Sequence, residues 1–287
     1  MFDKVEAYYR PLNVRDAVHL LKRGNGQAQI VAGATDVVVG NDRSIRFLID
    51  LSHAGLSYIQ RKNKSWVIGA TVTMADIENS LELRSLAGGI LALASSTCGS
   101  MQIRNVATVG GNLANRSPAA DIAVPLLALD ATVAIAGLGK RRKISLAEYL
   151  DGAREKRFAS TLLVEIAIPA LPDGPGGWAF HKLGRTAVDI SLVNVAAGLQ
   201  LDSKGRVSMA RIALGAVAPT PIRIHAAEQL LTEQRLTTEL IAEASHIVAR
   251  EVQPITDQRA TADYRREMSR VLSRRALQEC GTKAGCL

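Results

Sequence analysis

Apolar and polar positions along the first 170 residues follow helical spacing in some stretches and strand-like spacing in others. An apolar face spaced by three and four residues follows Asn13, an effective N-cap residue, and predicts a helix that reaches Leu21. Short apolar runs predict strands at 29–31, 47–49, 57–59, 66–70, 131–136, 142–144 and 162–168. Further helices are predicted at 73–77, 86–94 and 145–149. This half of the chain therefore mixes helices with strands, and Gly137-Leu138-Gly139 is expected to be a hairpin turn.

The pattern changes after residues 171–177, Leu-Pro-Asp-Gly-Pro-Gly-Gly, which form the best candidate for a domain boundary. Longer antiparallel strands are predicted at 178–182, 194–201 and 207–216, followed by helices at 226–231, 238–250 and 263–277. A sheet backed by helices is the arrangement that buries both kinds of element. We therefore predict an α+β fold with a smaller second domain.

Two glycine-centred turns are predicted, each ending in polar side chains. The first is Ala32-Gly33-Ala34-Thr35-Asp36, and the second is Thr108-Val109-Gly110-Gly111-Asn112. Glycine lets the backbone take a positive φ and carries no Cβ that would keep a ligand away. Amides freed in this way can hold an anion such as a pyrophosphate. For the second turn, a plain connection between a strand and a capped helix is the alternative.

A third polar stretch follows the second glycine turn. Ser117 and Pro118 are typical of an N-cap and a first helical residue. This assignment puts Asp121 in the first turn of a helix, where its carboxylate suits the helix dipole and could accept ribose hydroxyl groups. Pro125 is expected to kink or end that helix.

Composition narrows the possible classes of protein. The chain has 287 residues and no apolar run of the roughly 18 residues that span a bilayer. Its start lacks the layout of a secretory signal, so a cytoplasmic protein is expected. Cys98, Cys280 and Cys286 form no C-x-x-C pair, and the five histidines are scattered. A bound metal is therefore not expected on this chain.

The net charge of +8 could indicate a nucleic-acid binder. However, the basic residues are spread along the chain, with local runs only at 140–143 (Lys-Arg-Arg-Lys) and 265–266. Aromatic residues make up only 4% of the chain, which leaves few rings to stack on bases, so no nucleic-acid partner is expected. A phosphate pocket, an acidic partner and a solvated basic surface all remain open.

Two glycine turns that each adjoin polar groups suggest one long phosphate-bearing ligand, and a dinucleotide matches that description. The chain contains no G-x-G-x-x-G sequence, which argues against a doubly wound NAD domain. It contains no Walker A sequence either. A flavin domain of a different fold is the class that remains.

Six motifs in order carry a family resemblance. They are Val-Ala-Gly-Ala-Thr-Asp at 31–36, Gln-Ile-Arg-Asn-Val-Ala-Thr-Val-Gly-Gly-Asn at 102–112, Ser-Pro-Ala-Ala-Asp at 117–121, Phe-His-Lys-Leu-Gly-Arg at 180–185, Ala-Pro-Thr-Pro-Ile-Arg at 218–223 and Arg-Ala-Thr-Ala-Asp-Tyr-Arg at 259–265. Together they resemble the FAD-binding, or medium, subunit of the molybdenum hydroxylases, a family that includes bacterial xanthine dehydrogenases and carbon monoxide dehydrogenase.

The resemblance implies a two-part FAD-binding domain of the vanillyl-alcohol oxidase (PCMH) type at 1–172, with subdomains at about 1–55 and 56–172. A C-terminal domain like that of the carbon monoxide dehydrogenase flavoprotein would follow at 173–287. It also implies an oxidoreductase subunit whose FAD takes electrons from 2Fe–2S clusters on a partner subunit and gives them to an acceptor such as NAD. A molybdopterin-binding large subunit would oxidise the substrate, with a purine as the first hypothesis. The expected assembly is a heterotrimer or a dimer of heterotrimers.

The resemblance further implies a set of FAD-binding residues: Ile30, Val31, Ala32, Gly33, Ala34, Thr35, Asp36, Val37, Cys98, Thr108, Gly110, Gly111, Asn112, Asp121, Leu163 and Lys182. Asp121 would bind a sugar or the adenine side, and Lys182 would lie near the flavin. Leu163 would pack on a ring, and Cys98 stands where some relatives carry an aromatic residue. Ala34 replaces a commoner glycine, which requires a negative φ there. No catalytic acid, base or nucleophile is predicted, because the cofactors carry the chemistry.

Alternatives remain at this point. A free-standing FAD oxidase or reductase of the same fold is the alternative among enzymes, and a nucleotide-binding assembly module is the alternative outside them. Lys182 could instead be a solvated charge at a sheet edge. Arg116 could face a pyrophosphate or a partner, or form a surface ion pair. Asp189 is interpreted as a cap of the turn that precedes it.

Overall fold

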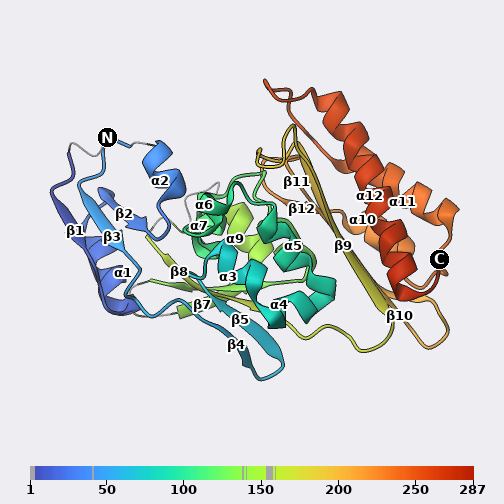
Figure 1. Cartoon of the computed structure of the whole chain (residues 1–287), viewed down its shortest axis with the longest axis horizontal. Coiled ribbons are helices and arrows are strands. Elements are labelled where there is room, and N and C mark those ends of the chain that lie inside the picture. The colour runs from blue at the N-terminus through green and yellow to red at the C-terminus, as the bar shows by residue number, and fades with distance from the viewer. Residues whose placement is uncertain (1–3, 41, 138, 140, 153–157, 159) are drawn as a thin grey trace. The chain divides into compact units, whose positions relative to one another are not determined.

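A computed structural model describes residues 4–40, 42–137, 139, 141–152, 158 and 160–287 (Figure 1). Leu138 of the predicted hairpin turn and Lys140 of the basic run lie outside these ranges. The chain forms two compact units. The first unit comprises Met1–Asp76, Met101–Arg116 and Asp130–Ala170, and the second comprises Ile77–Ser100, Ser117–Leu129 and Leu171–Leu287. The domain limits inferred from the sequence, 1–172 and 173–287, stay a prediction.

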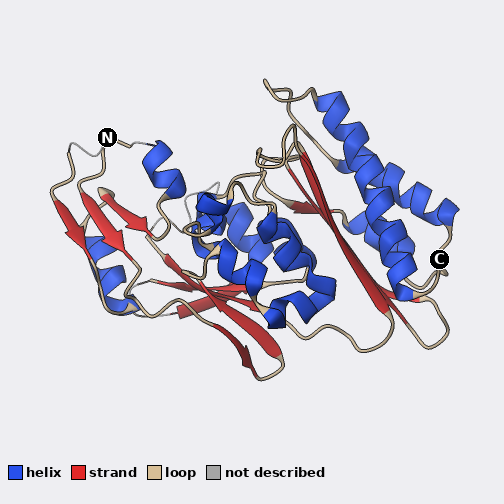
Figure 2. Ribbon diagram, in the orientation of Figure 1, coloured by secondary structure: helices blue, strands red, loops and turns tan. Residues whose placement is uncertain are grey.

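The first unit contains two sheets (Figure 2). A parallel sheet in the order β1-β3-β2 consists of β1 (Ala7–Tyr9), β2 (Ala28–Val31) and β3 (Phe47–Asp50). An antiparallel sheet in the order β4-β5-β8-β6-β7 consists of β4 (Ile59–Lys62), β5 (Ser65–Gly69), β6 (Thr132–Ala136), β7 (Arg141–Ser145) and β8 (Leu162–Ile168). The helices that begin in this unit are α1 (Val14–Arg23), α2 (Thr35–Gly40), α3 (Met74–Asn79), α6 (Met101–Arg104), α7 (Val109–Asn115) and α9 (Leu146–Gly152).

Local capping explains where these helices begin. The Asn13 side chain accepts a hydrogen bond of 2.9 Å from the amide of Asp16, which starts α1. At α3 the Thr73 hydroxyl accepts from the Asp76 amide, and the Asp76 carboxylate accepts from the Thr73 amide, both at 3.0 Å. Both predicted helix starts are confirmed. The strand expected at 57–59 instead begins at its last residue, as β4.

The second unit is built on one antiparallel sheet in the order β12-β11-β10-β9. Its strands are β9 (Gly176–Leu183), β10 (Val193–Leu201), β11 (Val207–Gly215) and β12 (Ile222–Arg223). Its helices are α4 (Leu81–Ser85), the 3-10 helix η1 (Leu86–Gly89), α5 (Ile90–Ser96), α8 (Ala123–Ala128), α10 (His225–Leu231), α11 (Thr238–Glu251) and α12 (Ala262–Ala284). With these elements the predicted α+β class is confirmed, including the antiparallel C-terminal sheet.

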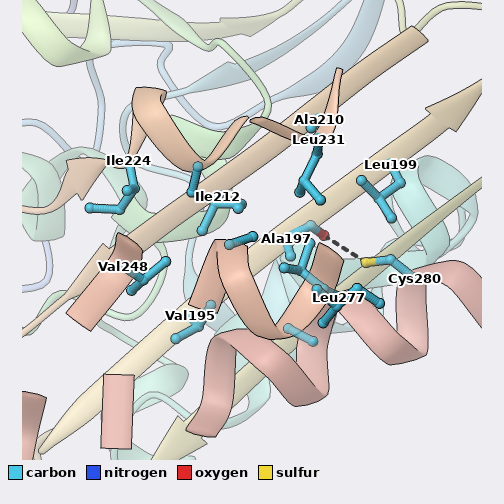
Figure 3. Packing of buried hydrophobic residues seen from close by; sticks show 14 of the residues in the cluster. Val195, Ala197, Leu199, Ala210, Ile212, Ile224, Leu231, Val248, Leu277 and Cys280 are labelled. Atoms are coloured by element: carbon cyan, nitrogen blue, oxygen red, sulfur yellow. Dashed lines mark hydrogen bonds between the residues drawn. The ribbon is translucent and has the colours of Figure 1, made fainter. Parts of the chain in front are cut away.

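Strand β10 is buried along its whole length because both of its faces are covered. Its odd-numbered residues, such as Val195 and Leu199, join the apolar core under α10, α11 and α12 (Figure 3). In the same core the Cys280 thiol of α12 donates to the Ala197 carbonyl at 3.4 Å. Side chains alternate across a strand, so Asn194 lies on the opposite face, where α8 packs on β10 and β11. That opposite face carries the polar cluster described below.

Two predicted helices differ from the structure. The helix expected at 86–94 starts only at Ile90, because Gly88 and Gly89 take φ values of +61° and +79° and form the end of η1. The helix expected after Ser117 starts at Ala123, so Asp121 precedes it. Pro125 is the third residue of α8. Amides in the first turn of a helix have no acceptor within the helix, so the missing N–H of proline costs no hydrogen bond there. It therefore lies at the beginning of this helix and does not end it.

None of the helices in the described ranges combines the length and the apolar character that a membrane crossing requires.

Candidate functional site

The first glycine turn connects β2 to α2 and packs directly against the chain that leads into the second turn. A Cβ atom at Gly33 would overlap the main-chain carbonyl of Val106 and would come within 3.0 Å of the α-carbon of Ala107. Only glycine allows this approach. The structure therefore brings the two predicted turns together within the first unit.

Ala34 adopts the left-handed conformation, with a φ of +57°. The expectation of a negative φ at this position is therefore wrong. The left-handed region costs an L-residue roughly 1–2 kcal/mol because its Cβ crowds the following carbonyl oxygen. The conformation is held because the Ala34 carbonyl accepts from the Val38 amide at 3.0 Å and so begins α2. Strain of this kind clusters at binding sites.

The amides of residues 33–37 are available to a ligand. Among the residues that the structure describes, none of these five amides has a recorded acceptor within the chain. They follow one another from the turn into the first turn of α2. Consecutive amides of this kind form a concave donor surface that suits phosphate oxygens.

The second turn has a different construction from the predicted one. Thr108 is the N-cap of α7, and Gly110 and Gly111 belong to that helix; neither has a positive φ. The amides of residues 109–112 are all used within the chain, by Val72, Ala70, the Thr108 hydroxyl and the Thr108 carbonyl respectively, at 2.9–3.1 Å. The expectation that this turn offers free amides is therefore wrong. Two of these amides donate to the segment after β5, and the other two donate to Thr108 within the helix cap.

The two glycines of α7 serve packing and access. A Cβ at Gly110 would lie 2.6 Å from both the Cβ and the carbonyl oxygen of Ala70, so this position needs glycine for the fold itself. Gly111 is exposed, and a Cβ there would meet only the Thr108 hydroxyl, at 2.9 Å. The side-chain oxygen of Asn112 is buried without a hydrogen-bond partner. This end of α7 therefore presents a bare backbone and an unsatisfied acceptor.

Asp121 and Lys182 form a buried ion pair in the second unit. Their side chains are 7% and 8% exposed, and the carboxylate and ammonium groups lie 2.7 Å apart. The other Asp121 oxygen accepts from the Ser191 hydroxyl at 2.5 Å and from the Asn194 side-chain amide at 2.8 Å. Lys182 also donates to the Thr97 carbonyl at 2.7 Å. Lys182 is therefore not a solvated edge charge, and the structure brings the two predicted residues into contact with each other; their contact with FAD stays a prediction.

Ser191 and Asn194 are members of this cluster that the sequence reading missed. Asn194 is fully buried on the central strand β10, and its neighbours on that strand are mostly apolar. A single polar residue inside such a run is the signal that could have singled it out. Ser191 gives no comparable signal, because it lies in the segment before the strand.

The remaining predicted residues are divided between the units. Leu163 lies on β8 opposite Ile135 and is 5% exposed, inside the first unit. Cys98 is half-buried in the second unit, directly after the Thr97 carbonyl that accepts from Lys182. The structure places Cys98 beside the buried cluster. Contact of either residue with FAD stays a prediction.

Several residues in or beside the motifs have structural roles. The guanidinium of Arg116 lies over the Tyr149 ring, 5.5 Å from its centre. Asp189 pairs with Arg185 at 3.2 Å, and its amide bonds to the Thr186 carbonyl, which agrees with the predicted turn. Arg223 forms a bidentate salt bridge with Glu228, with hydrogen bonds of 2.8 and 2.6 Å. These contacts account for Arg185 and Arg223, in the motifs at 180–185 and 218–223, by local structure.

Within the described part of the chain, no group of three or more His, Cys, Asp or Glu side chains is placed to hold a metal ion.

Comparison with known families identifies the chain. Residues 2–171 match the family described as the FAD binding domain in molybdopterin dehydrogenase, and residues 178–280 match the CO dehydrogenase flavoprotein C-terminal domain. The first match covers more than half of the chain. The chain belongs to this family of FAD-binding subunits. The resemblance found in its motifs is confirmed, and with it FAD as the cofactor and oxidoreductase as the class of enzyme.

Individual relatives match this FAD-binding subunit over 92% or more of its length. It is 34% identical to the xanthine dehydrogenase FAD-binding subunit of Escherichia coli O157:H7 over 99% of both chains. It is also 34% identical to the 6-hydroxypseudooxynicotine dehydrogenase complex subunit alpha of Paenarthrobacter nicotinovorans, over 92% of this chain and 90% of that one. Among solved structures, carbon monoxide dehydrogenase from Hydrogenophaga pseudoflava matches with a TM-score of 0.89 and 28% identity over 100% of both chains. The enzyme from Oligotropha carboxidovorans matches with a TM-score of 0.90 and 29% identity over 96% and 98%.

The residues of the first unit fit the FAD that the family binds. The amides of residues 33–37, which have no recorded acceptor in the described chain, have the donor chemistry that a pyrophosphate requires. The bare backbone at Gly111 leaves room for close approach, and the buried oxygen of Asn112 lacks a donor that a ligand hydroxyl or amide would supply.

Proposed function

We propose that this FAD-binding subunit relays electrons within a molybdenum-dependent dehydrogenase. In this scheme, 2Fe–2S clusters on a partner subunit supply the electrons, and an acceptor such as NAD receives them. The substrate is oxidised on a molybdopterin-binding large subunit. Two comparisons support the proposal: one relative is a subunit of a dehydrogenase complex, and one matching structure, at 28% identity and a TM-score of 0.90, is of a Cu,Mo-CO dehydrogenase.

The observation that carries the proposal is the row of unpaired amides at residues 33–37 beside the start of α7. FAD, when bound, supplies a group that takes up and releases electrons. The chain's own residues bind and orient it. The five amides hold the pyrophosphate, and Asn112 accepts a hydrogen bond from the adjoining part of the ligand. Direct contacts of Asp121 and Lys182 with FAD remain part of the proposal, although each of these groups already has partners within the chain.

We further propose a purine as the substrate of the complex. The support is the full-length similarity to the Escherichia coli xanthine dehydrogenase subunit. Other relatives carry names with different substrates, such as carbon monoxide for the medium chain from Hydrogenophaga pseudoflava. Substrate choice belongs to the partner subunit in this scheme, so it must be measured on the assembled complex. A heterotrimer or its dimer in the cytoplasm is the proposed state.

The decisive experiment is purification of the natural complex, followed by its absorbance spectrum, metal analysis and an activity screen. The proposal expects about one FAD per chain, with iron and molybdenum on two other co-purifying polypeptides. It also expects xanthine or hypoxanthine to reduce the flavin and NAD⁺ to be converted to NADH. A single polypeptide that holds FAD and turns over its own substrate would contradict the electron-relay role. Activity with a non-purine alone would contradict only the substrate.

A further inference from the structure

An open groove of about 720 Å³ lies in the second unit, where α11 ends and α12 has made its first turn. It is lined by His246, Ala249, Arg250, Val252, Gln253 and Arg266. His246 and Arg250 are four residues apart on α11 and therefore share one face of that helix. The residues of the groove belong to the second unit, whereas the glycine turns belong to the first.

The lining of the groove is basic. Three of its six residues can carry a positive charge, and none of the six is a carboxylate. Within the described ranges, no carboxylate is recorded as a partner of Arg250. Arg266 pairs with Asp263 at 2.8 Å, but the Asp263 side chain is 95% exposed, which makes this a weak surface pair. His246 and Arg250 are exposed, and Arg266 is held only by this weak surface pair.

A further carboxylate near the groove is already engaged. Glu267 interacts electrostatically with His246, but its main partner is Arg270. The Arg270 guanidinium donates to both Glu267 oxygens, at 2.5 and 3.0 Å. That pair lowers the pKa of Glu267 and keeps it ionised. Glu267 therefore does not neutralise the groove.

Size and apolar lining indicate the kind of occupant. The volume is more than ten times the roughly 30 Å³ that one water molecule takes in the liquid, so a single small anion would leave most of the groove to water. Val252 and Ala249 add apolar surface beside the basic groups. An occupant that satisfies both features carries carboxylates together with an apolar side chain. The chain's net charge of +8 also favours an acidic partner.

We propose that this groove binds an acidic segment of a partner polypeptide in the assembled enzyme. The inference rests on the proposed function in one respect, namely that the chain works within a complex. Arg250 also lies in the last turn of α11, where a cation stabilises the helix end without any partner. That local role does not account for Arg266, which comes from another helix and lines the same groove.

Charge reversal in the complex provides the first test. The variant Arg250→Glu with Arg266→Glu is expected to raise the dissociation constant between this chain and its co-purifying partners at least tenfold. It is also expected to flatten the dependence of that constant on salt concentration. The matched control is Arg274→Glu with Arg275→Glu, which reverses two exposed charges of α12 outside the groove. Thermal midpoint and FAD content, measured on both variants, show that the fold and the cofactor site are intact.

A carbodiimide cross-linking experiment identifies the contact directly. Arg250→Lys keeps the positive charge and introduces an amine, which forms an amide with an activated carboxylate at zero length and with loss of water. Mass spectrometry is expected to find this amide to an Asp or Glu of a partner chain. Arg274→Lys serves as the control and is expected to give no such product.

Four results would overturn the inference. The first two are an equal weakening of the complex by both charge-reversal variants and no weakening by either. The third is a cross-link from the new amine of Arg250→Lys to this chain alone. The fourth is that inorganic pyrophosphate stabilises the chain only when Arg250 is present, while assembly of the complex does not require Arg250. Each leaves the proposed function intact if FAD and partners are still present. Purification of the chain without any partner would overturn both proposals.

Discussion

Gly33 lies against the main-chain carbonyl of Val106, although 73 positions separate the two residues in the chain. The contact fixes the first glycine turn beside the segment that leads into α7. One turn contributes unpaired amides, and the helix start contributes a bare glycine and the orphaned oxygen of Asn112. The proposed FAD site therefore depends on the close approach that Gly33 allows.

Gly33→Ala is expected to push the two segments apart and to abolish retention of FAD. Overpacking of this kind costs about 1–3 kcal/mol, so the thermal midpoint is expected to fall as well. The checks are FAD per chain from the absorbance spectrum and calorimetry. Gly40→Ala is the matched control, because a Cβ there would meet nothing within 4 Å. Full flavin content together with an unchanged midpoint in the Gly33 variant would refute the assignment.

Substitutions at Gly110 and Gly111 are expected to separate folding from binding. Gly110→Ala places its Cβ 2.6 Å from Ala70 and is expected to destabilise the first unit. A Cβ at Gly111 would meet only the Thr108 hydroxyl, and the position is exposed, so the fold of Gly111→Val should persist while its branched side chain blocks the ligand. We expect FAD affinity to fall by tenfold or more, which corresponds to about 1.4 kcal/mol. Titration of apoprotein with FAD measures it, and wild-type affinity in a folded Gly111→Val protein would remove α7 from the site.

Ala34→Gly is expected to stabilise the chain. The left-handed φ of Ala34 strains an L-residue by about 1–2 kcal/mol, while glycine adds about 0.4–1 kcal/mol of unfolded-state entropy. The net gain is therefore about 0.5–1 kcal/mol, with FAD retention unchanged. Urea unfolding of the apoprotein checks the prediction. A loss of stability would mean that the left-handed turn is not strained in solution.

The sequence predicted elements whose signals are local. Asn13 and Thr73 were recognisable as helix caps, and both cap their helices. The motif at 31–36 marked a glycine turn, but it did not reveal that Ala34 takes a positive φ, because only the finished turn imposes that angle. Residue type alone could not decide the backbone conformation at this position.

The parts that the sequence did not predict depend on distant partners. The amides at the start of α7 looked free, yet Ala70 and Val72 accept two of them. Asp121 was expected in the first turn of a helix, whereas it precedes α8, and β10 brings Asn194 to its carboxylate. In both cases the outcome depends on which distant segment lies alongside, and spacing along the chain does not contain that information.

The buried pair of Asp121 and Lys182 provides a test of mutual dependence. Removing one partner leaves an uncompensated buried charge, which costs about 3–5 kcal/mol. Asp121→Asn and Lys182→Met are therefore each expected to destabilise the second unit strongly. The double variant removes both charges and is expected to be more stable than either single variant. Denaturant unfolding of all four proteins measures the coupling, and strictly additive losses would show that the two groups do not interact in solution.

Asp257 predicts a pH dependence of stability. Its carboxylate accepts from the Arg259 amide at 2.8 Å, the Ala260 amide at 3.2 Å and the Arg265 guanidinium at 2.8 Å. These bonds, led by the Arg259 amide, lower the pKa of Asp257 from 3.8 to about 2. Because the folded pKa lies below the unfolded one, the stabilisation is present above pH about 4 and is lost as the pH falls towards 2.

Other carboxylates titrate in the same window, so the prediction concerns the difference between the wild type and Asp257→Asn. The variant is expected to be less stable at pH 7 and to approach the wild type as the pH falls from 4 to 2. Thermal unfolding across this range measures the difference, with Glu251→Gln as the control that removes an exposed carboxylate from α11. A difference that stays constant from pH 7 to 2 would show that ionised Asp257 does not stabilise the fold through these bonds.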